Sequence, residues 1–217
     1  MSKPQLRVYL PIPDLQRQFA AFLSSPLPAR GYVPLEGTNS LFIEIAPGLS
    51  IERMLDLALK KEPGVEPGML AVERQFGMLE IHSDDTQALD RAGKAMLDWL
   101  ETDADAQIPP ELMFSDIIED ISDRHAVMIN RAKQASMLLP GQSLLIMEVT
   151  PALYGAYLAN AAEKAEPGNV LVDCRLIGAS GRIYVSGTPE RLARTRKAVE
   201  AGIKTLSRPK AASTGKS

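Results

Sequence analysis

The chain has 217 residues, of which 45% are hydrophobic and 24% are charged, and its formal net charge is −3. These values are ordinary for a soluble globular protein, and the slightly acidic balance argues against a nucleic-acid-binding function. No apolar run reaches the roughly 18 residues that a membrane helix needs, so we expect no membrane anchor and no signal peptide. The single cysteine, Cys174, excludes an internal disulfide and fits the reducing cytoplasm.

Short strands and helices alternate along the first half of the chain. The predicted strands are 6–12, 33–35, 40–45, 69–74 and 77–82. Pro13-Asp14 is expected to open a first helix, and apolar residues at helical spacing predict a second over 50–61. Ser83 is expected to cap a third helix. The acidic, proline-ended segment 101–110 indicates a linker.

The second half follows the same plan. Its predicted strands are 112–121, 141–149, 170–176 and 181–185, and its predicted helices are 123–135, 151–165 and a last one that starts at Thr188-Pro189. A hydroxyl cap followed by proline is a favoured helix start. Each half is therefore predicted to be a compact α+β unit, a small sheet covered by helices.

An internal repeat relates the two halves. Residues 42–83 match residues 146–187 at a shift of 104 positions. The matching anchors are Glu44 with Glu148, Pro47 with Pro151, Lys60 with Lys164, the triplet Glu-Pro-Gly at 62–64 with that at 166–168, and Gly77 with Gly181. A repeat of about half the chain indicates a tandem duplication. We therefore expect domains over 1–104 and 105–206, followed by a disordered tail over 207–217.

Candidate catalytic or metal-binding residues are scarce. His82 and His125 lie 43 residues apart without ligand-like spacing, and Cys174 lies in a predicted strand as a small buried side chain. The carboxylates cluster at helix starts and in the linker. The sequence has no nucleophile elbow, phosphate loop or dinucleotide-binding pattern. We expect no enzymatic activity, no cofactor and no metal site.

The two hairpin turns differ more than the elements around them. In the second half the turn is small, formed by Ile177, Gly178, Ala179 and Ser180. In the first half it is charged, with Glu73, Arg74 and Gln75. A solvated ion pair of little energetic value is the simplest interpretation of Glu73 and Arg74.

Residues 151–203 resemble a bacterial microcompartment shell domain, in which a helix ends near an edge lysine and a small turn between two strands lines a central pore. The elements that precede each half resemble the circularly permuted version of this domain. The phrases EIAPG at 44–48, VER at 72–74 and INR at 129–131 resemble the tandem, trimer-forming shell proteins of carboxysomes and related compartments. One departure is Ser180, which stands where the family usually has an aromatic residue.

The resemblance implies a ferredoxin-like α/β sandwich in each half and a structural role in a shell facet. It implies a homotrimer that forms a pseudohexamer, stacking of two trimers, contact with neighbouring hexameric shell proteins, and metabolite passage through a gated pore. The pore residues would be those of the two turns, with Glu73 and Arg74 as the gate. Lys60 and Lys164 would make tile-edge contacts, although a cation at a helix C-terminus is favoured without any edge role. The preferred location is a carboxysome shell in the cytoplasm.

A second class of function stays open at this point. Tandem α+β units of this size also serve as small-molecule-binding regulatory trimers that do not assemble into a shell. The charged turn and the two lysines favour the shell protein.

Overall fold

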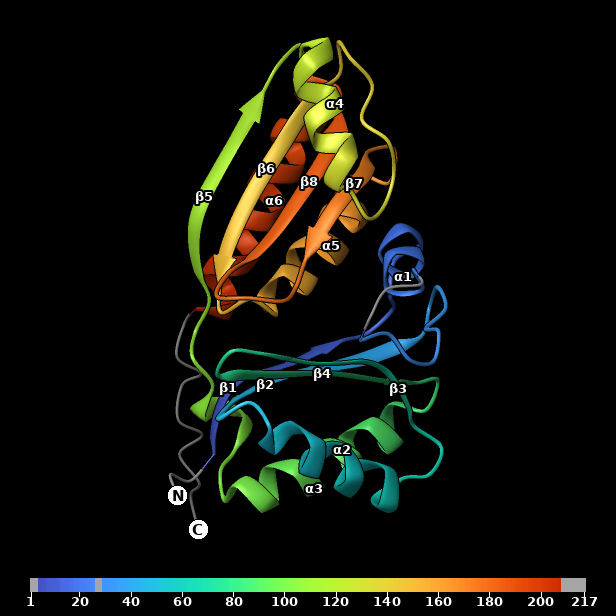
Figure 1. Cartoon of the computed structure of the whole chain (residues 1–217), viewed down its shortest axis with the longest axis vertical. Helices are drawn as coiled ribbons and strands as arrows, with labels where there is room; N and C mark the ends of the chain where they lie inside the picture. The colour runs from blue at the N-terminus through green and yellow to red at the C-terminus, as the bar shows by residue number, and fades with distance from the viewer. Residues whose placement is uncertain (1–3, 26–28, 208–217) are drawn as a thin grey trace, which may run out of the picture.

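The computed structural model describes residues 4–25 and 29–207, in which each half of the chain forms one four-stranded antiparallel sheet with helices packed on it (Figure 1). The first sheet has the strand order β1-β2-β4-β3 and the second the order β5-β6-β8-β7. This arrangement confirms the predicted α+β fold with a repeated unit. The predicted tail lies outside the described residues except for Ser207.

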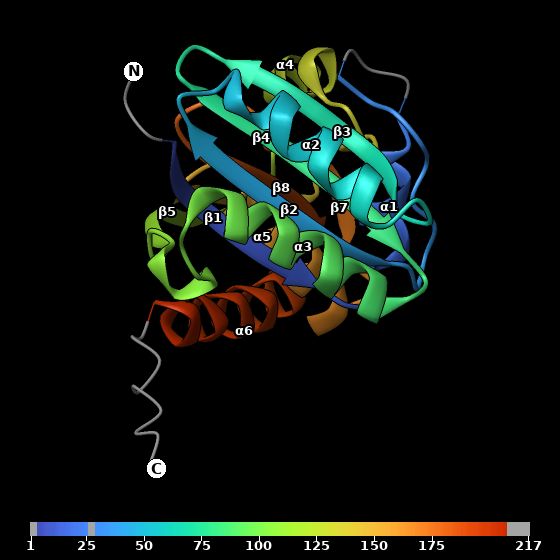
Figure 2. The same ribbon diagram turned by 90° about the horizontal axis from the view of Figure 1, so that it is seen from below.

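The first half contains the following elements: β1 (Gln5–Ile12), α1 (Arg17–Leu23), β2 (Asn39–Ala46), α2 (Ser50–Lys61), β3 (Glu66–Glu73), β4 (Phe76–Ser83) and α3 (Thr86–Leu100). Helices α2 and α3 lie side by side on one face of the sheet (Figure 2). The alternation of Leu79 and Ile81 with Met78 and Glu80 on β4 reflects the two faces, because successive side chains of a strand point in opposite directions.

The second half repeats this order after a short 3-10 turn, η1 (Ala104–Ala106). Its elements are β5 (Glu111–Ile118), α4 (Asp123–Ala132), β6 (Ser143–Thr150), α5 (Tyr154–Ala165), β7 (Val170–Arg175), β8 (Gly181–Gly187) and α6 (Pro189–Leu206). A shift of 104 superimposes the bounds of β2 and α2 on those of β6 and α5, and a shift of 106 superimposes β1 on β5. The bulges of β1 and β5 also match at this shift.

The repeated glycines have a packing reason. A Cβ at Gly77 would lie 2.2 Å from the carbonyl oxygen of Gly48, and a Cβ at Gly181 would lie 2.1 Å from that of Ala152. In both halves the strand therefore passes directly against the segment that opens the long helix, and only glycine leaves room for this approach.

The glutamate of each repeated Glu-Pro-Gly triplet has a structural role, because it forms an ion pair with the neighbouring helix. Glu62 accepts hydrogen bonds from Arg91 Nε at 2.6 Å and Nη2 at 3.0 Å, and Glu166 accepts one from Arg194 Nε. In each half the carboxylate thus joins the end of one helix to the helix beside it.

Helix α1 joins the two halves (Figure 1). Phe19 and Phe22 are buried in one apolar cluster with residues of α5, β7 and β8. Asn160 Oδ1 accepts a hydrogen bond from the backbone N–H of Gln16 at 2.8 Å. The carboxylate of Glu163 accepts hydrogen bonds from the backbone N–H groups of Gln18 and Phe19, in the first turn of α1. Free N–H groups at a helix N-terminus favour a carboxylate, so α5 supplies the polar cap that α1 lacks.

Several predicted boundaries were wrong. Asp14 has φ 59°, a left-handed conformation that cannot continue a helix, so α1 begins at Arg17 rather than at Pro13. Residues 33–35 form no strand. Asp85 rather than Ser83 caps α3, because its side chain accepts the N–H of Gln87.

Candidate functional site

The first hairpin turn presents its charges to solvent. Glu73 ends β3, and Arg74 and Gln75 form the turn to β4. Arg74 Nε lies 3.6 Å from Glu73 Oε1, and the Arg74 side chain is 89% exposed. Such a pair contributes little to stability. Arg74 also has φ 55°, a left-handed conformation that costs a non-glycine residue about 1 kcal/mol.

The second hairpin turn is held by its neighbours. Ser180 Oγ donates a hydrogen bond to Glu148 Oε1, and Arg182 Nε donates to the same oxygen at 3.0 Å. The Ser180 hydroxyl, and after it Arg182, lower the pKa of Glu148 below its usual range. Ile177 is exposed at the other end of the turn, and Gly178 has φ 131°. A β-carbon at Gly178 would meet no atom within 4 Å, so the turn borders open space.

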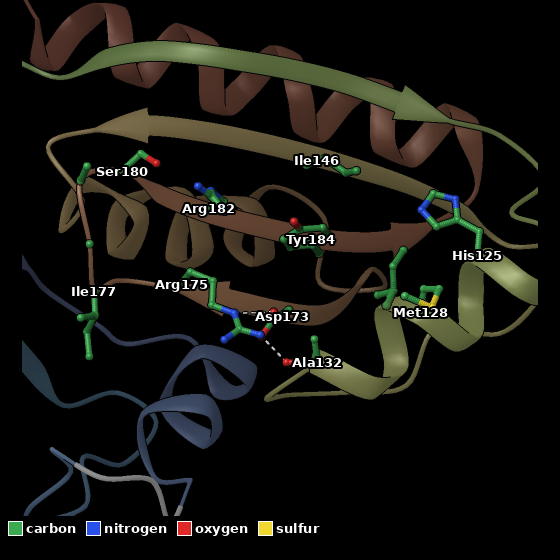
Figure 3. Close-up of a pocket in the computed structure, with 13 residues that line it drawn as sticks. His125, Met128, Ala132, Ile146, Asp173, Arg175, Ile177, Ser180, Arg182 and Tyr184 are labelled. Carbon is green, nitrogen blue, oxygen red and sulfur yellow. Dashed lines mark hydrogen bonds and ion pairs between the residues drawn. The ribbon is translucent and has the colours of Figure 1, made fainter.

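A cleft of about 560 Å³ lies beside this second turn (Figure 3). Its floor is the face of β6, β7 and β8 that α5 and α6 leave uncovered, and α4 forms one wall with His125 and Met128. Arg175 Nε binds Asp173 Oδ2 at 2.8 Å, and Arg175 also donates to the carbonyl of Ala132 on α4. No sequence pattern indicates this cleft, because its residues come from four separate elements.

Charged groups on the cleft floor are only partly solvated. Burial raises the pKa of Asp173, and the hydrogen bond from Arg175 offsets part of that rise. Arg182 and Tyr184 stand beside them on β8. At the positions equivalent to Arg182 and Tyr184, the first half has Met78 and Glu80, which are fully buried. The two halves therefore differ in how completely this face of the sheet is covered.

The two lysines lie near the C-terminal ends of α2 and α5. Lys60 Nζ binds Asp56 Oδ2 on its own helix at 2.8 Å. Lys164 Nζ lies 3.6 Å from Asp14 Oδ2, a residue of the other half of the chain. Both side chains remain largely exposed, so each can reach a neighbouring molecule.

His82 is buried between two carboxylates. Its Nδ1 lies 3.3 Å from Glu80 Oε1, and its Nε2 lies 3.4 Å from Glu66 Oε2. Burial alone would lower the pKa of His82, but the two carboxylates outweigh it and raise the pKa above the ordinary value. Among the described residues, no group of His, Cys, Asp and Glu side chains is placed to hold a metal ion, and no helix is long and apolar enough to cross a membrane. Cys174 is fully buried, as predicted.

Comparison with known proteins identifies the family. A family model described as the CsoS1D N-terminal domain matches residues 6–106. Over 203 residues the chain is 37% identical to the carboxysome shell protein CcmP of Synechococcus elongatus, covering 94% of this chain and 93% of CcmP. The chain belongs to the family of carboxysome shell proteins. The carboxysome shell protein CsoS1D of Hydrogenovibrio crunogenus is also 37% identical, over 93% of this chain and 97% of its own.

Solved structures of shell proteins share the fold. A double-ringed trimeric shell protein, MSM0271 from the RMM microcompartment, is 50% identical, with a TM-score of 0.90 over 94% of this chain and 98% of its own. A fused permuted hexameric shell protein, MSM0275 from the same compartment, is 42% identical, with a TM-score of 0.88 over 95% of this chain and 100% of its own. These similarities confirm the predicted tandem, permuted microcompartment fold. The chain is a shell protein and not an enzyme, and the regulatory-trimer alternative is not favoured.

Proposed function

We propose that three copies of this chain close into a ring of six similar domains, residues 1–104 and 105–206 of each chain, and that this ring is one tile of a microcompartment facet. The two hairpin turns would alternate around its central opening. Double-ringed and trimeric assembly is described for MSM0271, a protein of the same fold and half-identical sequence. The proposal rests on a feature of this chain itself, the contact between its two halves.

One side of that contact has an exposed counterpart on α2. Leu153, at the start of α5, is fully buried against the first half of the chain. The equivalent residue in the first half, Leu49, is 75% exposed at the start of α2. Leu176 and Val72 form a second such pair, the former buried and the latter exposed.

The other side of the contact has its counterpart around α4. Phe22 of α1 is 2% exposed, whereas its equivalent Met128 on α4 is 64% exposed. Val8 of β1 is buried, and its equivalent Phe114 on β5 is exposed. The described part of the chain thus exposes two apolar surfaces, Leu49 with Val72 and Phe114 with Met128, which correspond to the two sides of a contact that the chain already makes internally.

Two such surfaces on one chain favour a head-to-tail assembly. The surface with Leu49 on one copy can pack against the surface with Phe114 on the next copy, in the way that α5 packs against α1 within the chain. Heterologous contacts of this kind generate a closed ring when the rotation closes. Each chain supplies two domains, so three chains give six positions around the axis.

The ring would give the two turns different roles. Glu73 and Arg74 are free to leave their weak mutual contact, since Arg74 is almost fully exposed. Pairing of Arg74 with Glu73 of a neighbouring chain would narrow the opening, and withdrawal of both side chains would widen it. Two such states need to differ by only a few kcal/mol for a ligand to shift their populations. Charged side chains around an opening also select permeant ions by sign.

The tile would meet further shell proteins at its rim and a second ring on one face. Lys60 and Lys164 would make the rim contacts. Carboxysomes are the compartment named for the curated relatives, and the RMM microcompartment is the one named for the more similar structures. The proposed tile serves either compartment, and we retain the carboxysome as the proposed context.

Electron microscopy of the purified chain tests this function. We expect particles with threefold symmetry and a central opening, which pack side by side into flat layers at high protein concentration. Rings that never form layers would support a trimer without a shell role. Particles without a ring would contradict the proposal.

A further inference from the structure

A buried carboxylate fastens the two halves of the chain to each other. Glu44, on β2, is fully buried at their contact. Its Oε1 accepts a hydrogen bond from Arg7 Nε at 2.7 Å, and its Oε2 accepts one from the backbone N–H of Leu153 at 3.2 Å. Leu153 is the residue before the first turn of α5, so Glu44 caps the N-terminus of that helix across the contact.

The same donor and the same acceptor recur on the two exposed surfaces. Glu148 is the repeat equivalent of Glu44, and Leu49 is that of Leu153. Leu49 has φ −62° and ψ −17°, close to the −67° and −14° of Leu153, so its N–H points from the start of α2 in the same way. In the described part of the chain, the hydrogen bonds of Glu148 both go to Oε1, from Ser180 and Arg182.

Two other polar contacts between the halves also have matched partners. Gln16 N–H donates to Asn160 within the chain, and the equivalents are Ser122 and Asp56, again a backbone donor and an acceptor. Lys164 pairs with Asp14 within the chain, and the equivalents are Lys60 and Asp120. Both lysine side chains are largely exposed, so these pairs contribute little to the ring and leave the lysines available at the rim. Asp14 and Asp120 share the left-handed conformation, with φ 59° and 50°.

The capping of α1 by Glu163 has no equivalent on α2, and a residue of α4's own N-terminus replaces part of it. Glu163, which caps α1, has Leu59 as its equivalent on α2. On α4, Ser122 Oγ accepts the N–H of His125, the equivalent of the Phe19 N–H that Glu163 accepts on α1. Apart from the position of Glu163, the donors and acceptors of the two exposed surfaces are therefore complementary to each other.

We propose that Glu148 accepts the Leu49 N–H of the next copy of the chain through Oε2 while Oε1 stays bound to Ser180, so that this one side chain ties the second hairpin turn to the contact between chains. This inference rests on the proposed ring. It gives Ser180, which stands in place of an aromatic residue, a function: its hydroxyl connects the turn to the carboxylate.

The first half lacks this connection. The residue equivalent to Ser180 is Phe76, and Arg7 lies over its ring at 4.0 Å while binding Glu44. Glu44 is thus held by a strand residue, Arg7, and not by the turn. The turn with Glu73 and Arg74 is consequently free of the contact between chains, whereas the turn over 177–180 is ordered by it.

Substitution of Leu49 by proline tests the contact, because proline removes the backbone N–H and its fixed φ near −65° suits the −62° observed here. Leu49→Ala is the matched control, since it also removes the side chain but keeps the N–H. Association of the full-length chain is measured by sedimentation over a concentration series. A hydrogen bond to a charged acceptor makes about a tenfold difference or more, so we expect Leu49→Pro to associate at least about tenfold more weakly per contact than Leu49→Ala.

Hydrogen exchange of the peptide containing 177–180 tests the link to the turn. At concentrations where both variants are fully assembled, we expect faster exchange in Leu49→Pro than in Leu49→Ala, although the substituted residue lies on a neighbouring chain. Equal association of the two variants would overturn the contact. Weaker association with unchanged exchange would overturn the link.

Two controls separate a folding defect in Leu49→Pro from the loss of the contact, and separate failure of the ring from failure of the Glu148 contact. Circular dichroism shows whether Leu49→Pro folds, and if it does not, Glu148→Ala replaces it with the same expected effects on association and exchange relative to the wild type. A wild-type chain that stays monomeric at every concentration would contradict the ring itself. A wild-type ring that Glu148→Ala leaves unchanged would contradict only the role of Glu148.

Discussion

Leu153 and Leu49 occupy equivalent positions in the repeat but opposite environments, which makes them a matched pair for testing the ring. Leu153 is fully buried in the cluster that joins the two halves. Truncation of a buried leucine to alanine costs about 2–5 kcal/mol, a large part of the stability of an ordinary domain. We therefore expect Leu153→Ala to lower the free energy of unfolding by that amount in urea denaturation.

Leu49→Ala should behave in the opposite way. The side chain is 75% exposed in the single chain, so its loss should change the free energy of unfolding of the dissociated chain by no more than about 0.5 kcal/mol. If the ring buries Leu49 as the chain buries Leu153, the lost burial is about 1.5–3 kcal/mol per contact. Each contact then weakens about 10- to 100-fold.

The assay combines urea denaturation below the association threshold with sedimentation over a concentration series. A variant with unchanged stability and weaker association supports the ring. If Leu49→Ala assembles as tightly as the wild type, the exposed leucine is not at a contact between chains and the argument from the repeat is wrong.

Three more outcomes follow from the same structure. Glu73→Ala and Arg74→Ala should each raise flux through reconstituted rings while leaving stability within about 0.5 kcal/mol, because an exposed ion pair contributes little; unchanged permeability in both would remove the gate. His82 has a raised pKa in the folded chain, so its charge stabilises the fold below about pH 6.5 and this stabilisation is lost as the pH rises through the raised value. His82→Gln should flatten that dependence in denaturation curves, and an identical pH profile would refute it. Lys60→Ala combined with Lys164→Ala should prevent flat layers in electron micrographs while particles of trimer mass remain, and normal layers would remove the rim role.

Much of the fold could be predicted because each half carries the same signals. Residues 50–61 were predicted as a helix with the bounds that the structure shows, since the apolar spacing and the flanking proline and glycine agree. Thr188 followed by Pro189 gave the start of α6 correctly. The errors occurred where the conformation of a single residue sets the start of a helix. At Asp14 a left-handed conformation prevents helix formation, so α1 begins only at Arg17.

The candidate site was less accessible to sequence reasoning. The turns could be located from the repeat and the resemblance, but the cleft beside the second turn could not, because it depends on how α4 lies over the sheet. The contact between the halves was also invisible in the sequence. Glu163 on α5 caps α1 from 145 residues away, and nothing local to either segment indicates this pairing.

Light scattering after gel filtration measures the mass of the assembled particle and so tests the proposed ring. A ring of three 23.6 kDa chains has a mass of roughly 71 kDa, and two stacked rings have about twice that. Either value agrees with a ring in which the two exposed apolar surfaces meet between chains, and the Leu49 variants test that contact itself. A stable monomer or dimer at high concentration would contradict the ring, and with it the pore between the two kinds of turn.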